Sequence, residues 1–389
     1  MRLLHTSDWH LGRSLHRTDL RAAQAAFLDH LVDTVRSEQV DAVLVSGDVY
    51  DRAVPPVDAV QLCESALVRL RGDGARVVVI SGNHDSARRL GFGSALVDAS
   101  GVHLRTRVAD CAVPVMLADD HGEVAVYGIP YLEPEAVRTA LPPDPADPEA
   151  EAPRGHAGVL GRGLACVRAD LATRPAARSV VLAHAWVTGG QASESERDVT
   201  VGGVASVPAS LFDAFTYSAL GHLHGPQTLS EGLRYSGSPL AYSFSEAAHV
   251  KGSWLVELDA SGLSRVEHVP APVPRRLSSI QGRLENLLTS SRFTPQEQDW
   301  LTVVYTDDLR PDDAMERLTA RFPFVLVLKH EPEGRCADGL TYAARLAGRT
   351  DLEVGAAFVE HVRRAALDPA EQLLFEQALE ASRLAAANA

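Results

Sequence analysis

Short apolar runs alternate with longer amphipathic segments through the first part of the chain. The runs have the length and character of buried β-strands, and they lie at residues 3–4, 42–45, 77–80, 124–127, 180–183 and 215–220. Helices are expected where apolar residues recur every three to four positions. These positions are Leu20, Phe27, Leu31 and Val35, then Val60, Cys63, Leu67 and Leu70, and later Leu160, Leu164, Val167 and Leu171. The alternation indicates an α/β fold with helices on the faces of a sheet.

Two proline-rich segments interrupt this pattern. Residues 142–155 (PPDPADPEAEAPRG) are also acidic and cannot hold regular structure. We expect a surface insertion there, because strand patterns continue on both sides. Residues 269–276 (VPAPVPRR) carry prolines at alternate positions, which favours an extended linker at the end of the first domain.

A smaller domain and a helical tail are expected beyond this linker. Residues 301–305, 311–321 and 325–328 have a strand, helix, strand pattern, and a last helix is predicted after Asp368, followed by proline and glutamate. We therefore predict three parts. They are a main domain at 1–270, a small α+β capping domain at 275–335 and a helical tail at 336–389. The tail helices either dock on a partner chain or pack on their own domain.

Polar side chains follow the ends of the predicted strands. They are Asp8, His10, Asp48, Asn83, His184, His222 and His224. Open α/β sheets bind ligands at the carboxyl ends of their strands, and packing does not demand polar residues at so many exits. Each motif alone can be explained without a metal, since Gly-Asn is common in β-turns and a lone histidine after a strand usually has a structural role. Their joint occurrence in this order favours a metal centre.

The donor types suggest which ions would bind. Asp8 and His10 lie two residues apart, so an extended chain places both on one side, as chelation requires. Imidazole, carboxylate and amide donors suit Mn²⁺, Fe²⁺, Zn²⁺ or Mg²⁺, and the lack of cysteine donors argues against a structural zinc site. We expect two divalent ions, with Mn²⁺ as the favoured metal. Held by only two charged ligands, Asp8 and Asp48, they would leave a positive pocket that attracts a phosphodiester.

Composition limits the class of protein. The chain has 389 residues, a formal net charge of -14 and a mean hydropathy of -0.05. This acidic balance argues against a nucleic-acid coat protein. Net charge describes the whole chain, however, and a single cleft can still be positive. No apolar stretch reaches membrane-spanning length, no charged-then-apolar leader is present, and the four cysteines form no CxxC. A cytoplasmic protein without a membrane partner is expected.

The motif order DxH, GDxxD, GNHD, H and GHxH resembles the calcineurin-like metallophosphoesterases over roughly residues 1–258. The resemblance implies a sandwich of two mixed sheets flanked by helices. It also implies two metal sites that share Asp48 as a bridge. One site would comprise Asp8, His10, Asp48 and His224, and the other Asp48, Asn83, His184 and His222.

The same resemblance assigns roles to residues beside the ligands. His84 would contact the leaving group or the transition-state oxygens rather than a metal ion. Asp51 resembles the family carboxylate that orients this histidine, and its alternative is a solvated loop acid. Arg52 could bind a phosphate oxygen through its guanidinium fork, although Ala53 replaces the glycine of the form GDxxDRG.

Longer stretches are similar to the SbcD family, the nuclease subunits of bacterial SbcC-SbcD complexes. These stretches are RLLHTSDWHLGRSLH at the start, GDVYDR at 47–52 and YSGSPLAYSFSE at 235–246. The similarity implies a 3'-5' exonuclease on duplex DNA and an endonuclease on single strands and hairpins, acting in DNA repair, replication and recombination. It also implies a homodimer within a heterotetramer with an SbcC-type coiled-coil ATPase. No GxxxxGK[ST] motif occurs in this chain, so ATP dependence would come from that partner.

Basic residues near the motifs are candidates for DNA contact. Arg13, His16 and Arg17 follow the first ligand pair, and Arg88 follows the third motif, although exposed solubilising charge explains them equally well. Two other functions are alternatives. A small-molecule or phosphoprotein phosphoesterase would need neither capping domain nor tail, and a noncatalytic scaffold would have lost ligands, of which none is missing.

Overall fold

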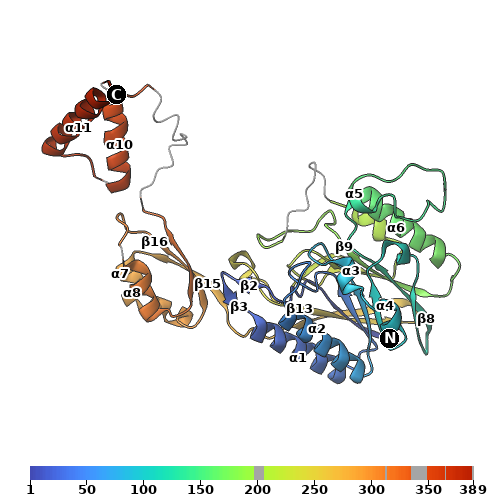
Figure 1. Ribbon diagram of the computed structural model, residues 1–389. Coiled ribbons are helices and arrows are strands. Elements are labelled where there is room, and N and C mark those ends of the chain that lie inside the picture. Colours follow the sequence, from blue (N-terminus) through green and yellow to red (C-terminus); the bar gives the residue numbers. More distant parts are fainter. Residues whose placement is uncertain (197–205, 312, 334–347, 364, 388–389) are drawn as a thin grey trace. The chain divides into compact units, whose positions relative to one another are not determined.

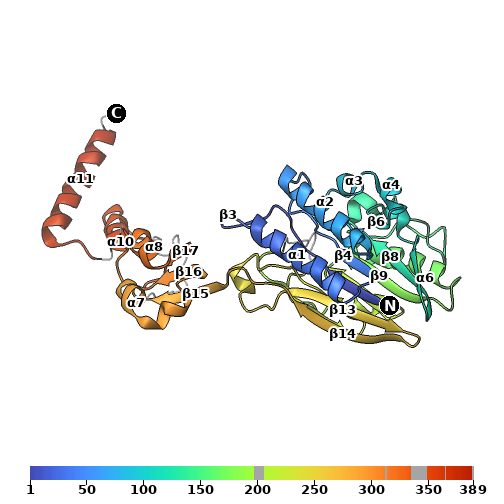
Figure 2. The same ribbon diagram turned by 90° about the horizontal axis from the view of Figure 1, so that it is seen from below.

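The computed structural model describes residues 1–196, 206–311, 313–333, 348–363 and 365–387. The chain divides into two compact units, Met1–Arg276 and Leu277–Ala389 (Figure 1, Figure 2). The start of the expected tail, through residue 347, lies outside the described residues. Within the described part of the chain, no helix combines the length and apolar character that a membrane crossing requires.

The first sheet of the larger unit has the strand order β14-β13-β1-β4-β5-β6. Its parallel strands are β1 (Arg2–Thr6), β4 (Ala42–Ser46), β5 (Arg76–Ile80) and β6 (Val102–Arg105). The antiparallel pair β13 (Gly252–Asp259) and β14 (Gly262–Pro270) extends it beside β1. The parallel strands β1, β4 and β5 are buried almost throughout because both faces of the sheet are covered.

The second sheet has the order β11-β12-β10-β9-β8-β7. Its strands are β7 (Val115–Asp119), β8 (Gly122–Ile129), β9 (Arg178–His184), β10 (Tyr217–Gly221), β11 (Gln227–Ser230) and β12 (Leu233–Tyr235). The central strands β8, β9, β10 and β12 are parallel, and the outer strands β7 and β11 are antiparallel to their neighbours. Both sheets are therefore mixed.

Three hydrophobic layers hold this unit together. Side chains such as Leu44, Val126 and Leu182 pack between the sheets. Helices α1 (Arg21–Ser37) and α2 (Val57–Gly72) cover the outer face of the first sheet, and α6 (Gly155–Leu171) covers that of the second (Figure 1). The expected sandwich of two mixed sheets flanked by helices is confirmed.

Shorter elements connect these layers. They are the hairpin β2 (Ser14–Leu15) and β3 (Thr18–Asp19), helices α3 (Ala87–Leu90), α4 (Ser94–Asp98) and α5 (Pro134–Val137), and 3-10 helices η1 (Val108–Asp110), η2 (Ala209–Phe212) and η3 (Phe244–Glu246). Residues 138–154 are all described and contain no helix or strand. The acidic segment expected to be an insertion lies within this stretch.

The end of the larger unit differs from the sequence prediction. β14 continues to Pro270, so the first two residues of the expected linker belong to a strand. A further strand, β15 (Leu277–Gly282), begins after residue 276, where the expected linker ends, and was not predicted. Only Ile280 of its six residues is fully buried, so the strand lacks the continuous apolar run that marks the others.

The second unit has its own small core. Its parallel sheet has the order β15-β16-β17, with β16 (Trp300–Tyr305) and β17 (Val325–His330). Helices α7 (Leu284–Thr289) and α8 (Ala314–Arg321) and the 3-10 helix η4 (Ser291–Gln296) pack on it. Helix α8 begins at Ala314, three residues after its predicted start.

Two helices, α10 (Asp351–Arg363) and α11 (Pro369–Ala387), form the C-terminal tail. Asp368 caps α11, because its carboxylate accepts the N–H groups of Ala370 at 2.9 Å and Glu371 at 2.8 Å. The ring of Phe375 packs where Gly355 leaves no Cβ in the way. The two helices thus contact each other.

Candidate metal centre

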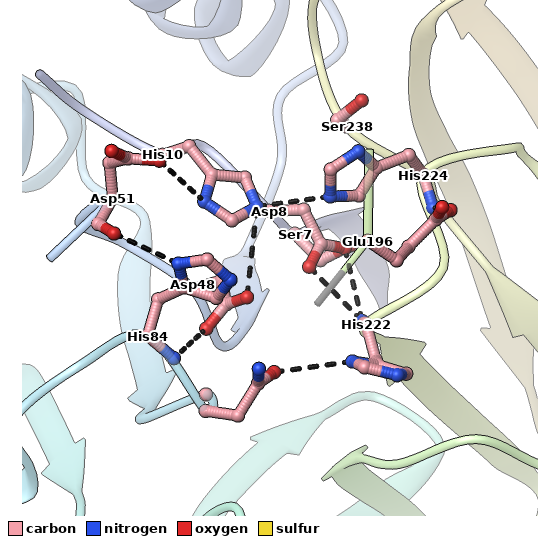
Figure 3. Close-up of polar contacts among 12 residues, drawn as sticks. Ser7, Asp8, His10, Asp48, Asp51, His84, Glu196, His222, His224 and Ser238 are labelled. Atoms are coloured by element: carbon pink, nitrogen blue, oxygen red, sulfur yellow. Dashed lines mark hydrogen bonds and ion pairs between the residues drawn. The ribbon is translucent and has the colours of Figure 1, made fainter. Parts of the chain in front are cut away.

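The seven expected ligands lie at the carboxyl ends of five strands. They are Asp8 and His10 after β1, Asp48 after β4, Asn83 after β5, His184 at the end of β9, and His222 and His224 after β10. Within each sheet these strands are parallel neighbours, so their ends meet at one edge of the sandwich. Figure 3 shows side chains from both sheets pointing toward one another.

The backbone at these strand ends takes unusual conformations. Asp8, His10 and Asp48 have φ values of 52°, 45° and 49°, in the left-handed region that costs a non-glycine residue free energy. Gly47 precedes Asp48 with φ of 90°, and a Cβ there would collide with the ring of His184. The tight approach of the first sheet to His184 therefore requires glycine at position 47.

Hydrogen bonding determines which nitrogen of His184 can ligate. Its Nδ1 lies 2.9 Å from the carbonyl oxygen of Ser46, which only accepts, so Nδ1 carries the hydrogen. Burial lowers the pKa of His184 to about 3, so the ring is neutral and Nε2 presents a lone pair. That nitrogen lies 2.9 Å from Asn83 Oδ1 and 3.6 Å from Asp48 Oδ2. An imidazole nitrogen close to an amide oxygen and a carboxylate oxygen is an arrangement that would bind a cation.

A second group of donors faces the other side of Asp48. His10 Nε2 lies 3.0 Å from His224 Nε2 and 3.7 Å from Asp48 Oδ2. Ligand atoms of Asp8, His10 and His224 lie within 4.8 Å of one another, as do those of Asp8, Asp48 and His184. Asp48 is therefore placed between the two groups, as a bridging ligand would be.

The charges at this site favour cations. Burial raises the pKa of Asp8 to about 7 and that of Asp48 well above its usual value, and it holds His10 and His222 neutral by lowering their pKa values. Ionised carboxylates in such a site need a positive partner. The donor set of two carboxylates, one amide oxygen and four imidazoles therefore fits a pair of divalent cations.

Asp85, the last residue of GNHD, ties two of the ligand loops together. Its carboxylate accepts the backbone N–H groups of Gly82 at 2.9 Å, Val49 at 3.1 Å and Tyr50 at 2.9 Å. The loop that carries Asp48 is thereby fixed to the loop that carries Asn83. The GNHD pattern contains this residue but does not by itself indicate its role.

Comparisons with known proteins agree with this architecture. A family model for calcineurin-like phosphoesterases matches residues 1–129, and one for the type 5 capsule protein repressor C-terminal domain matches residues 273–363. The chain is 32% identical over 333 residues to the SbcD subunit of nuclease SbcCD from Staphylococcus saprophyticus, and the match covers 85% of each chain. This chain belongs to the SbcD family. It is accordingly a metal-dependent phosphodiesterase of the nuclease type that the sequence predicts.

Two solved structures are also similar to this SbcD-family chain. The protein TT1561 of Thermus thermophilus is 16% identical, with a TM-score of 0.39, and the match covers 69% of this chain and 98% of that one. A dimetal phosphatase from Danio rerio is 14% identical, with a TM-score of 0.40, and the match covers 70% and 99% of the two chains.

His84 and Asp51, the two residues given catalytic roles by the family resemblance, lie beside the expected metal ligands. The backbone N–H of His84 donates to Asp48 Oδ1 at 2.9 Å, and its ring lies edge-on to that of His10. His84 Nδ1 donates to the backbone carbonyl of Asp51 at 2.8 Å. The Asp51 carboxylate lies 3.7 Å from His10 Nδ1 and 3.8 Å from Arg13 Nε. Asp51 thus contacts His84 through its main chain, whereas the family resemblance assigns that contact to the carboxylate.

The predicted DNA-contact residues fall into two groups in this SbcD-family structure. His16 and Arg17 lie at the tip of the β2-β3 hairpin, and Arg52 and Arg88 follow two of the ligand loops on the surface. Arg13 differs, because it is largely buried and turned inward. Its guanidinium donates to the carbonyl of Ser195 at 2.9 Å and lies over the ring of Tyr242.

Proposed function

We propose that this chain hydrolyses DNA phosphodiesters with two divalent metal ions, Mn²⁺ being the expected metal. The observation that carries the proposal is the position of Asp48 between the two groups of donors, 3.7 Å from His10 Nε2 and 3.6 Å from His184 Nε2. Asp8, His10, Asp48 and His224 would hold one ion. Asp48, Asn83, His184 and His222 would hold the other.

When bound, such a pair of ions activates water for attack on phosphorus and stabilises the negative charge of the transition state. The protein orients the reacting groups. With Nδ1 donating to the Asp51 carbonyl, His84 directs Nε2 away from that contact, and we assign this nitrogen to the phosphate or the leaving oxygen. The N–H of His84 also fixes the Asp48 carboxylate, so one residue links the bridging ligand to the substrate.

We assign the DNA contacts to the basic residues at the rim. His16 and Arg17 project from the hairpin that follows the Asp8 loop, and Arg52 and Arg88 follow the Asp48 and Asn83 loops. Basic side chains around the cation site would bind backbone phosphates on either side of the cleaved bond. We propose a subsidiary role for Arg13, which shapes the wall of the site through its contacts with Ser195 and Tyr242.

The reaction is tested with end-labelled duplex and hairpin DNA in the presence of Mn²⁺. The proposal includes 3'-5' degradation of duplex ends and endonuclease cleavage of hairpins and single strands, as the resemblance to the SbcD family implies. Product length shows the polarity, because a 5'-labelled strand shortens stepwise only when digestion starts at its 3' end. Metal-loaded protein that leaves every DNA substrate intact, with or without its partner, would contradict the proposal.

The tail helices support a partner of the SbcC type, a coiled-coil ATPase. Large apolar side chains of α10 and α11 are exposed although the two helices pack together, and these are Phe358, Val362, Leu373, Leu374 and Leu384. An amphipathic helix pair with an uncovered apolar surface is suited to docking on helices of another chain. The nucleotide-binding motif that this chain lacks would then be supplied by the partner.

A second apolar surface supports the homodimer. Phe92 and Leu96 are 89% and 84% exposed, and Val54 and Val57 are exposed on the neighbouring segment. Arg89 donates to the carbonyl of Ala53 at 2.8 Å and so joins the two segments. We propose that two copies meet through this surface and form a heterotetramer with two ATPase subunits. A cytoplasmic location is part of the same proposal, since the chromosome is the substrate.

A further inference from the structure

Glu246 and Lys251 form a buried ion pair behind the metal ligand His224. Their side chains are 0% and 5% exposed. Lys251 Nζ donates to the Glu246 carboxylate, to Ser238 Oγ at 2.9 Å and to the carbonyl of His224 at 2.8 Å, so its three hydrogens all have acceptors. A buried ion pair is often no more stabilising than apolar side chains of the same volume. Its presence beside a metal ligand therefore suggests a role other than stability.

The ion pair determines the tautomer and the position of the His224 ring. His224 Nδ1 lies 2.5 Å from Ser195 Oγ, whose hydroxyl donates to the Glu246 carboxylate, and 3.3 Å from Glu246 Oε1 itself. Both oxygens accept from the ring, so the hydrogen of the ring is on Nδ1. The lone pair is then on Nε2, which faces His10 Nε2 at 3.0 Å. The main chain of His224 is held as well, because its N–H donates to Glu196 at 2.7 Å and its carbonyl accepts from Lys251. Both the tautomer and the position of the ligand are fixed.

His184, on the other side of Asp48, has a weaker support of the same kind. Its Nδ1 donates to a neutral backbone carbonyl, that of Ser46. A carboxylate partner makes the opposite nitrogen of an imidazole a better donor to a metal than a neutral carbonyl does. The two groups of ligands are therefore supported unequally.

We propose that Glu246, paired with Lys251, is a positioning residue for His224 and makes the site of Asp8, His10 and His224 the tighter of the two cation sites. This inference rests on the two-metal function proposed above. Glu246 is the last residue of YSGSPLAYSFSE. This stretch carries the resemblance to the SbcD family, but its pattern indicates no chemical role for Glu246.

Metal binding by the full-length protein tests the inference. Isothermal titration with Mn²⁺, after chelation and desalting, is compared for wild type, Glu246→Gln and the exposed control Glu123→Gln. In Glu246→Gln one of the two ions should bind about 10- to 100-fold more weakly and the other should be unchanged. Cleavage by this variant should recover at a correspondingly higher Mn²⁺ concentration.

A second variant separates loss of metal affinity from an effect of misfolding. Glu246→Gln leaves Lys251 buried without its counter-ion, whereas Glu246→Gln with Lys251→Met removes both charges together. The double variant should show the same weakening of one ion. Two ions of unchanged affinity, or equal weakening of both, would overturn this inference alone. Wild-type protein that binds fewer than two ions would instead overturn the proposed function.

Discussion

Replacement of Asp85 by Asn should loosen the metal centre without removing any ligand. The carboxylate accepts three backbone N–H groups, from Gly82, Val49 and Tyr50. Asn keeps one of the two oxygens and points an NH₂ group at a former donor. Losing a hydrogen bond to a charged group costs about 1.5–3 kcal/mol, and an unsatisfied buried N–H costs about 1–3 kcal/mol. We expect the free energy of unfolding to fall by about 3–5 kcal/mol, a large share of the roughly 5–15 kcal/mol typical of a domain.

The same change should reduce catalysis, because Asp85 fixes the loop of Asp48 to the loop of Asn83. A displacement of about 1 Å in a reacting group can cost about 100-fold in rate. Calorimetry of the metal-free protein measures the first effect, where about 2–4 °C of melting temperature corresponds to 1 kcal/mol in a domain of this size. Mn²⁺-dependent cleavage measures the second. The control is Asp120→Asn, an exposed carboxylate. A variant that melts and cleaves like wild type would refute the idea that Asp85 holds the two loops together.

Other predictions concern the reaction, the partners and the metal. His84→Gln should still bind Mn²⁺ but lose about 100- to 10,000-fold in kcat, and retained turnover would remove His84 from the mechanism. Deletion of residues 350–389 should spare cleavage and abolish binding to the ATPase in a pull-down, and unaltered association would exclude the tail. Phe92→Asp combined with Leu96→Asp should yield monomers in light scattering, so a persistent dimer would place the interface elsewhere. Mn²⁺ at about 100 times the Kd of a site should stabilise the folded protein by about 2.7 kcal/mol for the ion bound there, measured as a higher melting temperature than in chelator.

Local patterns predicted strands that are buried on both faces and helices that are buried on one face. The runs at 42–45 and 77–80 became β4 and β5, and the amphipathic spacing from Leu20 to Val35 became α1. β15 was missed because its residues are mostly half-buried or exposed. β14 was not predicted either, and its last two residues fell in the expected linker, since Pro270 lies at the last position of an edge strand, where proline is tolerated.

The contacts around the seven expected ligands were harder to predict than the positions of those side chains at strand ends. Asp85 acts on Val49 and Tyr50, which lie 36 and 35 positions away along the chain, and Glu246 acts on His224 across 22 positions. Such contacts join a side chain to a backbone group or to a distant ring, and no residue spacing indicates them. The position of Arg13 could not be predicted for the same reason. Its charge made it a candidate for DNA contact, and only the structure shows that its side chain lies against Asp51 and Tyr242.

The sequence by itself determined the α/β class, the order of the seven donors and the family, because each depends on residue types within a few positions of a strand end. Only the tertiary structure decided which donors face each other across Asp48 and which nitrogen of His184 carries the hydrogen. It also showed that an ion pair lies behind His224. The physical reason is that ligand geometry and tautomer depend on where separate strands end relative to one another, and the packing of two sheets sets those positions.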